Sequence, residues 1–167
     1  ELDVPAPVEP GANVRPVGGD ARAGDLVLAA GTRIGAAQIG ALAAAGVAEV
    51  AVVRRPKVVV LSTGTELRAP GETLEAGQIY ESNAPMLAAA FEAAGAEVER
   101  IGPVSDDEGE HRRALERGLE ADVLVSSGGV SVGPHDLVRR ILAELGVAED
   151  FWGVAVRPGK PLAFGVR

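Results

Sequence analysis

The order of apolar and polar positions along the chain changes near residue 57. Beyond that position, apolar runs of strand length alternate with segments whose apolar residues recur at helical spacing. Residues 57–62 form a continuous apolar run, which is typical of a strand buried on both faces. Strands that alternate with helices favour an α/β domain with a mostly parallel sheet covered on both faces. The pattern predicts strands over 57–62, 97–101, 122–125, 151–156 and 162–164, helices over 85–94, 105–119 and 137–145, and a long loop over 63–78.

Residues at the ends of these segments indicate where the helices begin and end. Either Ser82 or Asn83 is the predicted N-cap of the first helix, and Gly95 ends it. Ser105 and Glu108 have the spacing of a capping box, which opens the second helix. Gly146 is expected to stop the third helix.

The first 56 residues have a weaker pattern. Several prolines between residues 4 and 11 exclude a helix there. The chain is therefore interpreted as a partial N-terminal or linking region, 1–56, followed by an α/β domain, 57–167. The N-terminal region is predicted to hold short strands over 25–28 and 50–53 and one helix over 38–45, which Gly46 ends.

Composition narrows the possible functions. The net charge of −8 disfavours proteins that bind nucleic acid or anionic membranes, because both partners require a basic face. The absence of cysteine excludes disulfides, thiolate metal sites and a cysteine nucleophile. No signal peptide and no apolar run of membrane-spanning length is visible, so a cytoplasmic protein is expected. The chain does not begin with Met, which indicates a processed product or a fragment.

The segment 126–136 contains the most distinctive chemistry. It runs from a predicted strand through glycines and hydroxyl residues into a predicted helix. Glycines let the backbone approach a ligand closely, and amides at the start of a helix point toward negative charge. The segment matches neither a Walker A loop nor a dinucleotide-binding fingerprint. It therefore predicts an anion site without naming a nucleotide.

Four loops are expected to share one rim, because ligands bind outside the carboxyl ends of parallel strands. The loops are 62–66, 105–107, 126–136 and 157–161. Amides and cations in them would hold an anion, and the carboxylates would hold Mg²⁺ or take part in proton transfer. The carboxylates are Glu66, Asp106 and Asp136, and the cations are Arg157 and Lys160.

Each of these residues also has a purely structural interpretation. Asp106 and Asp136 suit the start of a helix, and Glu66 suits a solvated loop. Arg157 and Lys160 would then be ordinary surface charges, and the glycine pair would serve a tight turn. His111 is expected to be exposed on a polar helix, whereas His135 lies within the glycine-rich loop.

Taken together, the loops resemble one family. The segments 61–67, 77–83, 126–133 and 157–165 are similar in order and spacing to motifs of the MoeA-type molybdopterin molybdenumtransferases, which are related to the gephyrin E domain. The segments 11–16 and 30–33 resemble the region before this domain in the same family.

The resemblance implies a three-layer α/β/α domain and an activity. The family inserts molybdate into adenylylated molybdopterin and releases AMP with a divalent metal, here taken as Mg²⁺. The resemblance also implies a homodimer, and it implies the adenylyltransferase of the same pathway as a partner. Glu66, Asp106 and Asp136 match acidic positions, which implies catalytic residues and metal ligands. The implied cofactor-binding residues are Thr63, Gly64, Ser127, Gly128, Gly129, Ser131, Gly133, Arg157 and Lys160.

The chain departs from the family pattern at several positions. Thr65 stands where the family has an acidic residue, His135 where an aromatic is common, and Gly153 where Lys is common. The chain ends at Arg167, before the family's Pro-Gly-Asn-Pro loop and C-terminal β-domain, which implies a truncated domain that is inactive alone. The alternatives are the adenylyltransferase of the same fold, a non-catalytic scaffold or binding module, and a CinA-like domain.

Overall fold

The computed structural model describes residues 7–128 and 137–167, and the chain divides into two compact units, Glu1–Val53 and Arg54–Arg167. The described part of the first unit contains the helix α1 (Ala36–Ala44), and none of its described residues is buried. The strands predicted over 25–28 and 50–53 are wrong. Leu26 is 79% exposed and Val53 is 94% exposed. A strand needs a neighbour for its backbone hydrogen bonds, and no described residue pairs with these segments.

The helix α1 confirms the helix expected over 38–45. It ends as predicted at Gly46, which has a φ of +76°. The amide of Gly46 donates to the carbonyl of Ala43, and the amide of Val47 donates to the carbonyl of Leu42. This pair of bonds is a Schellman motif, which needs a left-handed residue that glycine adopts without strain.

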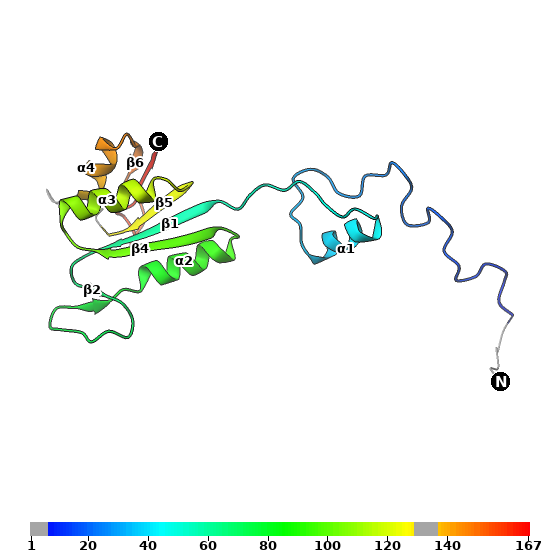
Figure 1. Cartoon of the computed structure of the whole chain (residues 1–167), viewed down its shortest axis with the longest axis horizontal. Helices are drawn as coiled ribbons and strands as arrows, with labels where there is room; N and C mark the ends of the chain where they lie inside the picture. The colour runs from blue at the N-terminus through cyan, green and yellow to red at the C-terminus, as the bar shows by residue number, and fades with distance from the viewer. Residues whose placement is uncertain (1–6, 129–136) are drawn as a thin grey trace. The chain divides into compact units, whose positions relative to one another are not determined.

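The second unit is built on a parallel sheet, which confirms the predicted α/β class. Its strands are β1 (Lys57–Thr63), β4 (Glu97–Val104) and β5 (Val123–Ser127), in the order β4-β1-β5 (Figure 1). The central strand is β1, and its residues from Val58 to Thr63 are all buried. Burial on both faces explains why this strand reads as an unbroken apolar run.

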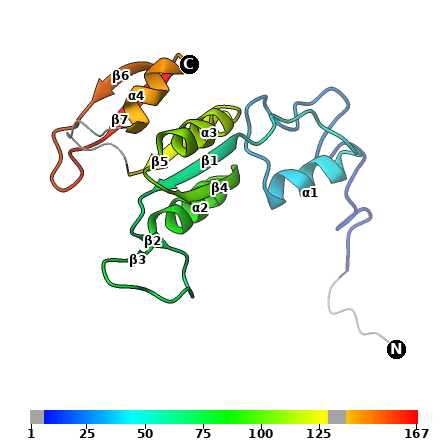
Figure 2. The same cartoon turned by 60° about the vertical axis from the view of Figure 1, so that its left-hand side comes forward.

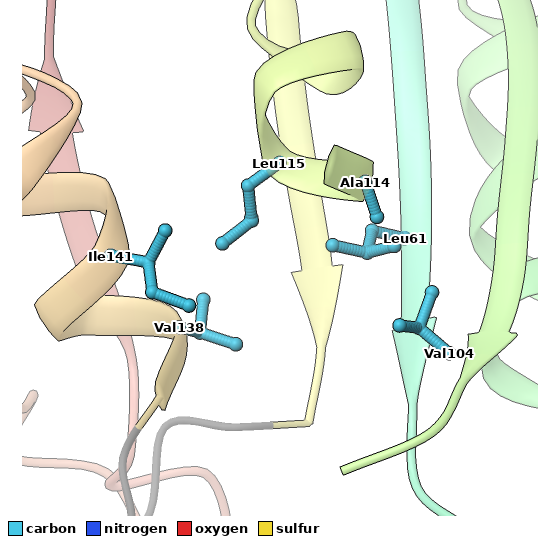
Figure 3. Packing of buried hydrophobic residues seen from close by; sticks show 6 residues of the cluster. All are labelled: Leu61, Val104, Ala114, Leu115, Val138 and Ile141. Atoms are coloured by element: carbon cyan, nitrogen blue, oxygen red, sulfur yellow. The ribbon is translucent and has the colours of Figure 1, made fainter. Parts of the chain in front are cut away.

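Helices cover both faces of the sheet and make three layers. The helix α2 (Asn83–Ala93) lies on one face, and α3 (Glu108–Gly118) lies on the other (Figure 2). On the α2 face, Val58 and Val60 pack with Ala84 and Ala96. On the α3 face, Leu61 joins a cluster that includes α4 (Leu137–Glu144). Figure 3 shows that cluster: Leu61, Val104, Ala114, Leu115, Val138 and Ile141.

The N-cap position predicted for α2 is confirmed, whereas the N-cap predicted for α3 is wrong. Ser82 occupies the N-cap of α2, but its side chain makes no capping bond. Instead, the buried Glu81 accepts a hydrogen bond of 2.8 Å from the amide of Ala84. The N-cap of α3 is Asp107, not Ser105, and it accepts from the amide of Glu110 at 2.8 Å. The strand β4 continues to Val104, and the helix begins at Glu108, later than predicted.

The expectation that His111 is exposed is also wrong, since its side chain is only 2% exposed. The buried residues of α3 are His111, Ala114, Leu115 and Gly118, which recur at the spacing of one helical face. A ring nitrogen, Nδ1, lies 3.2 Å from the carbonyl oxygen of Asp107. The polar residues around His111 therefore belong to the outer face of the helix, whereas His111 itself belongs to the inner one.

Two small strand pairs stand outside the parallel sheet. Within the predicted loop 63–78, β2 (Leu67–Arg68) begins and pairs in parallel with β3 (Ile79–Tyr80). Near the C-terminus, β6 (Ala148–Trp152) pairs antiparallel with β7 (Ala163–Val166). The strand predicted over 151–156 therefore lies earlier in the chain, and it does not belong to the parallel sheet. Among the described helices, none combines the length and apolar character that a membrane span requires.

The carboxylate of Asp122 binds the chain at the beginning of β1, and we call this set of hydrogen bonds the clamp. Asp122 accepts two hydrogen bonds of 2.5 Å from the guanidinium of Arg54 and one of 2.8 Å from the amide of Lys57. These bonds, first the one from Arg54 and then the one from Lys57, hold the pKa of Asp122 well below its usual range. They favour the charged carboxylate in the folded state, so the clamp stabilises the fold only while Asp122 is ionised.

Replacing Asp122 by asparagine is expected to lower the stability of the chain at neutral pH. The pKa of Asp122 is lower in the folded state than in the unfolded state. The stabilisation that the ionised carboxylate provides is therefore complete above about pH 4, the usual carboxyl pKa, and is lost as the pH falls toward the pKa of the folded state. Urea unfolding of both proteins between pH 7 and pH 2 would measure this. A stability difference that stays constant down to pH 2 would contradict the role of the ionised clamp.

Candidate functional site

Three strands of the parallel sheet end at one edge. Thr63 of β1 is in register with Val104 of β4, and Ser62 is in register with Ser127 of β5. Because the strands are parallel, the loops that follow them leave the sheet on the same side. The first three of the four predicted loops therefore begin side by side.

The first and second loops are joined by hydrogen bonds. The hydroxyl of Thr65 donates to Oδ2 of Asp106 at 3.0 Å. The amide of Gly64 donates to the carbonyl of Val104, also at 3.0 Å. Both Thr65 and Asp106 are exposed, and within the part of the chain that the structure describes the second carboxylate oxygen of Asp106 accepts no hydrogen bond. The structure thus brings together two of the predicted site segments, 41 residues apart in sequence.

Glu66 lies directly over the backbone of Gly64. A Cβ added to Gly64 would stand 2.5 Å from Oε2 of Glu66, which is closer than real Cβ contacts allow. Gly64 also has a φ of +143°, a conformation that side chains rarely adopt. The glycine therefore allows the carboxylate of Glu66 to fold back along the loop.

The third loop begins against the first. A Cβ on Gly128 would stand 2.7 Å from Oγ1 of Thr63 and 3.0 Å from its carbonyl oxygen. The φ of Gly128 is +104°, so both space and backbone conformation require glycine. The hydroxyl of Ser126 donates to the carbonyl of Gly128 at 3.2 Å. The edge of the sheet thus brings together Thr63, Gly64 and Gly128.

A cavity of about 400 Å³ opens beside the first two loops. Its lining includes Gly64, Thr65, Arg68, Glu72 and Ser105. The half-buried guanidinium of Arg68 donates through Nη1 to the carbonyls of Thr65 and Leu67. The cavity therefore places a cation beside the Thr65–Asp106 contact. Arg68 carried no signal in the sequence beyond its position after the first motif.

The fourth loop does not leave the parallel sheet. Arg157 and Lys160 are exposed on the connection between β6 and β7, which form their own antiparallel pair. The argument that placed this loop on the common rim is therefore wrong, because it assumed a fourth parallel strand. Among the described residues, no hydrogen bond or ion pair joins Arg157 or Lys160 to the first two loops.

Several predicted site residues lie outside the described residues. These are Gly129, Ser131, Gly133, His135 and Asp136. Within residues 7–128 and 137–167, we find no group of three or more carboxylate or histidine side chains that could hold a metal ion. Mg²⁺ is commonly held by one or two carboxylates together with substrate phosphates. The exposed carboxylate of Asp106, which Thr65 binds through one oxygen, fits that kind of binding.

One residue of the edge was missed by sequence reasoning. Asn83, the first residue of α2, donates from Nδ2 to the hydroxyl oxygen of Ser127 at 3.0 Å. The sequence pattern predicts only a capping role for Asn83. Its position within the segment 77–83, which resembles a family motif, was the signal that pointed to it.

Two protein-family models match separate parts of this chain. Residues 59–167 match the model described as a probable molybdopterin binding domain. Residues 1–46 match the model of the MoeA N-terminal region, domains I and II. The described strands and loops of the candidate site therefore all lie within or beside the first of these matches.

Individual relatives carry related names. A molybdopterin molybdenumtransferase of Haemophilus influenzae is 40% identical over 158 residues, covering 94% of this chain and 39% of that protein. Molybdopterin molybdenumtransferase 2 of Mycobacterium tuberculosis is 40% identical over 162 residues, covering 93% of this chain and 40% of that protein. The chain thus spans about two fifths of the length of these curated relatives.

Solved structures agree with this grouping. The molybdopterin biosynthesis MoeA protein of Pyrococcus horikoshii has a TM-score of 0.77 and 37% identity, covering 89% of this chain and 37% of that one. A molybdenum cofactor biosynthesis protein of Pyrococcus furiosus has a TM-score of 0.62 and 28% identity, covering 88% and 43%. Because the domain model matches more than half of its residues, the chain belongs to the molybdopterin-binding domain family.

Proposed function

We propose that the protein containing this chain inserts molybdate into adenylylated molybdopterin and releases AMP, and that this chain supplies its molybdopterin-binding domain. The observation that carries the proposal is the meeting of Thr65, Asp106 and Gly128 with their loops at one edge of a domain of this family. The match of residues 1–46 to the MoeA N-terminal region favours this activity over the adenylyltransferase of the same fold.

The described residues suggest distinct roles at this edge. The hydroxyls of Thr63 and Ser127 and the backbone at Gly128 lie close together, which suits the phosphate of a pterin ligand. Gly64 belongs to the same binding edge and holds the first loop in place, because its amide donates to the carbonyl of Val104. Asp106 has one carboxylate oxygen held by Thr65, which leaves the other for a metal or a proton. When bound, Mg²⁺ would neutralise phosphate charge there.

Other residues belong to the same proposal by resemblance. Glu66 and Asp136 would complete the acidic set, both as catalytic residues and as metal ligands. Gly129, Ser131 and Gly133 would continue the binding loop of Ser127 and Gly128. Arg157 and Lys160 would contact molybdate or phosphate. A homodimer, a cytoplasmic location and contact with the pathway's adenylyltransferase complete the proposal.

Calorimetric titration of the natural full-length protein with molybdopterin adenylate tests this function. We expect saturable binding that Mg²⁺ strengthens, followed by consumption of the adenylate and release of AMP once molybdate is added. Accumulation of adenylate from molybdopterin and ATP would instead identify the adenylyltransferase. Absence of binding to both molybdopterin and its adenylate would contradict the proposal.

A further inference from the structure

The side chains of Asn83 and Ser127 meet at the edge where the glycine-rich loop begins. Asn83 is the first residue of α2, and Ser127 is the last residue of β5. Side chains alternate along a strand, so Ser127 lies on the same face of β5 as Val125, which packs in the cluster beneath α2. This placement brings Nδ2 of Asn83 within 3.0 Å of Oγ of Ser127.

The direction of this hydrogen bond matters. The amide nitrogen of asparagine can only donate, so the oxygen of Ser127 is the acceptor. A hydroxyl has one proton and two lone pairs, and the bond from Asn83 occupies a lone pair. The proton of Ser127 is therefore not used by Asn83. Within the described residues, no other hydrogen bond takes it up.

The residues around Ser127 indicate which group its hydroxyl proton could bind. Ser127 is half-buried and immediately precedes Gly128, whose backbone is pressed against Thr63. The neighbouring hydroxyl, on Ser126, is already engaged, because it donates to the carbonyl of Gly128. Among the described residues, Ser127 is thus the hydroxyl at the start of this loop whose proton has no acceptor, and that proton is available to an anionic ligand.

We propose that Asn83 is a positioning residue, whose amide holds the hydroxyl of Ser127 so that its proton points to an anionic group of the substrate. The inference rests on the proposed function, in which Ser127 contacts the phosphate end of molybdopterin. It adds a residue from the face of α2 to a site otherwise built from loops that follow the strands.

The test is to reverse the direction of the bond. In Asn83→Asp, the carboxylate can only accept, so the proton of Ser127 turns toward residue 83 and away from the ligand. The added negative charge also repels an anion, and Ser82→Asp is the matched control. Ser82 is exposed, is next in sequence and makes no side-chain capping bond, so its variant adds the same charge without touching Ser127.

Affinity for molybdopterin adenylate is measured by calorimetry on the full-length protein and on the variants, each also made with Ser127→Ala. We expect Asn83→Asp to weaken binding about 10- to 100-fold more than Ser82→Asp, because a hydrogen bond to a charged group is lost. With Ser127→Ala present, the two acidic variants should weaken binding equally. Melting temperatures identify any variant that fails to fold. If Asn83→Asp fails to fold, Asn83→Ala replaces it, both alone and combined with Ser127→Ala.

Three results are decisive. Equal losses for Asn83→Asp and Ser82→Asp in the presence of Ser127 would overturn the inference, because direction would not matter. Unchanged affinity in Ser127→Ala alone would also overturn it, while the proposed function would stand. If the unmodified protein binds no adenylate, the proposed function fails together with the inference.

Discussion

Replacing Asp106 by asparagine is expected to lower the rate of molybdate insertion on the order of 10²-fold or more, the usual range for a lost acid or base. The carboxylate lies where two loops of the site meet, and the hydroxyl of Thr65 holds Oδ2. Asparagine keeps the shape of the side chain and still accepts from Thr65 through its one oxygen. It removes the negative charge that a metal or a transferred proton would need. Single-turnover assays of AMP release in the full-length protein measure the effect.

The neighbouring residue provides a matched control for this substitution. Asp107→Asn removes the same charge one position along the chain. Asp107 caps α3 by accepting from the amide of Glu110, and asparagine caps helices about as well as aspartate. We therefore expect Asp107→Asn to retain nearly full activity and stability. Equal losses in the two variants would mean that the activity depends on total charge near α3 and not on Asp106.

The sequence pattern predicted the layers of the fold where burial is extreme. The central strand β1 is buried on both faces, and this leaves a run of apolar residues that is visible without any partner. The strand β6 reads Ala-Glu-Asp-Phe-Trp and carries no such signal. It is held by pairing with β7, and pairing between strands is not recorded in the local order of apolar residues. The segments near Leu26 and Val53 that were wrongly predicted as strands are apolar, but no described strand pairs with them.

The grouping of the loops in the candidate site could be predicted from the sequence, but the hydrogen bonds between their residues could not. Parallel strands place their following loops together, so the association of the first three loops follows from topology alone. The bond between Thr65 and Asp106 joins residues far apart in sequence, and the register of β1 against β4 decides it. The contact between Asn83 and Ser127 depends in the same way on how α2 packs against β5.

The second large effect is expected for Gly102→Ala, which should destabilise the chain by about 4 kcal/mol, the sum of a strained backbone and an overpacked contact. Gly102 lies in β4 at a bulge, where the register with β1 shifts between Leu61 and Thr63. Its φ is +109°, and an added Cβ would overlap the carbonyl oxygen of Ser62. Backbone on both sides fixes this contact, so no side-chain rotation can relieve it.

Gly95→Ala separates the two causes of this loss. Gly95 ends α2 with a φ of +99°, and an added Cβ would meet nothing within 4 Å. Its variant should therefore lose only the conformational part, about 1–2 kcal/mol. Urea unfolding followed by the fluorescence of Trp152, the single tryptophan, compares the two. Equal losses would show that the strand yields at the bulge. A larger loss in Gly102→Ala would mean that this rigid bulge holds Ser62 and Thr63 where the loops of the site begin.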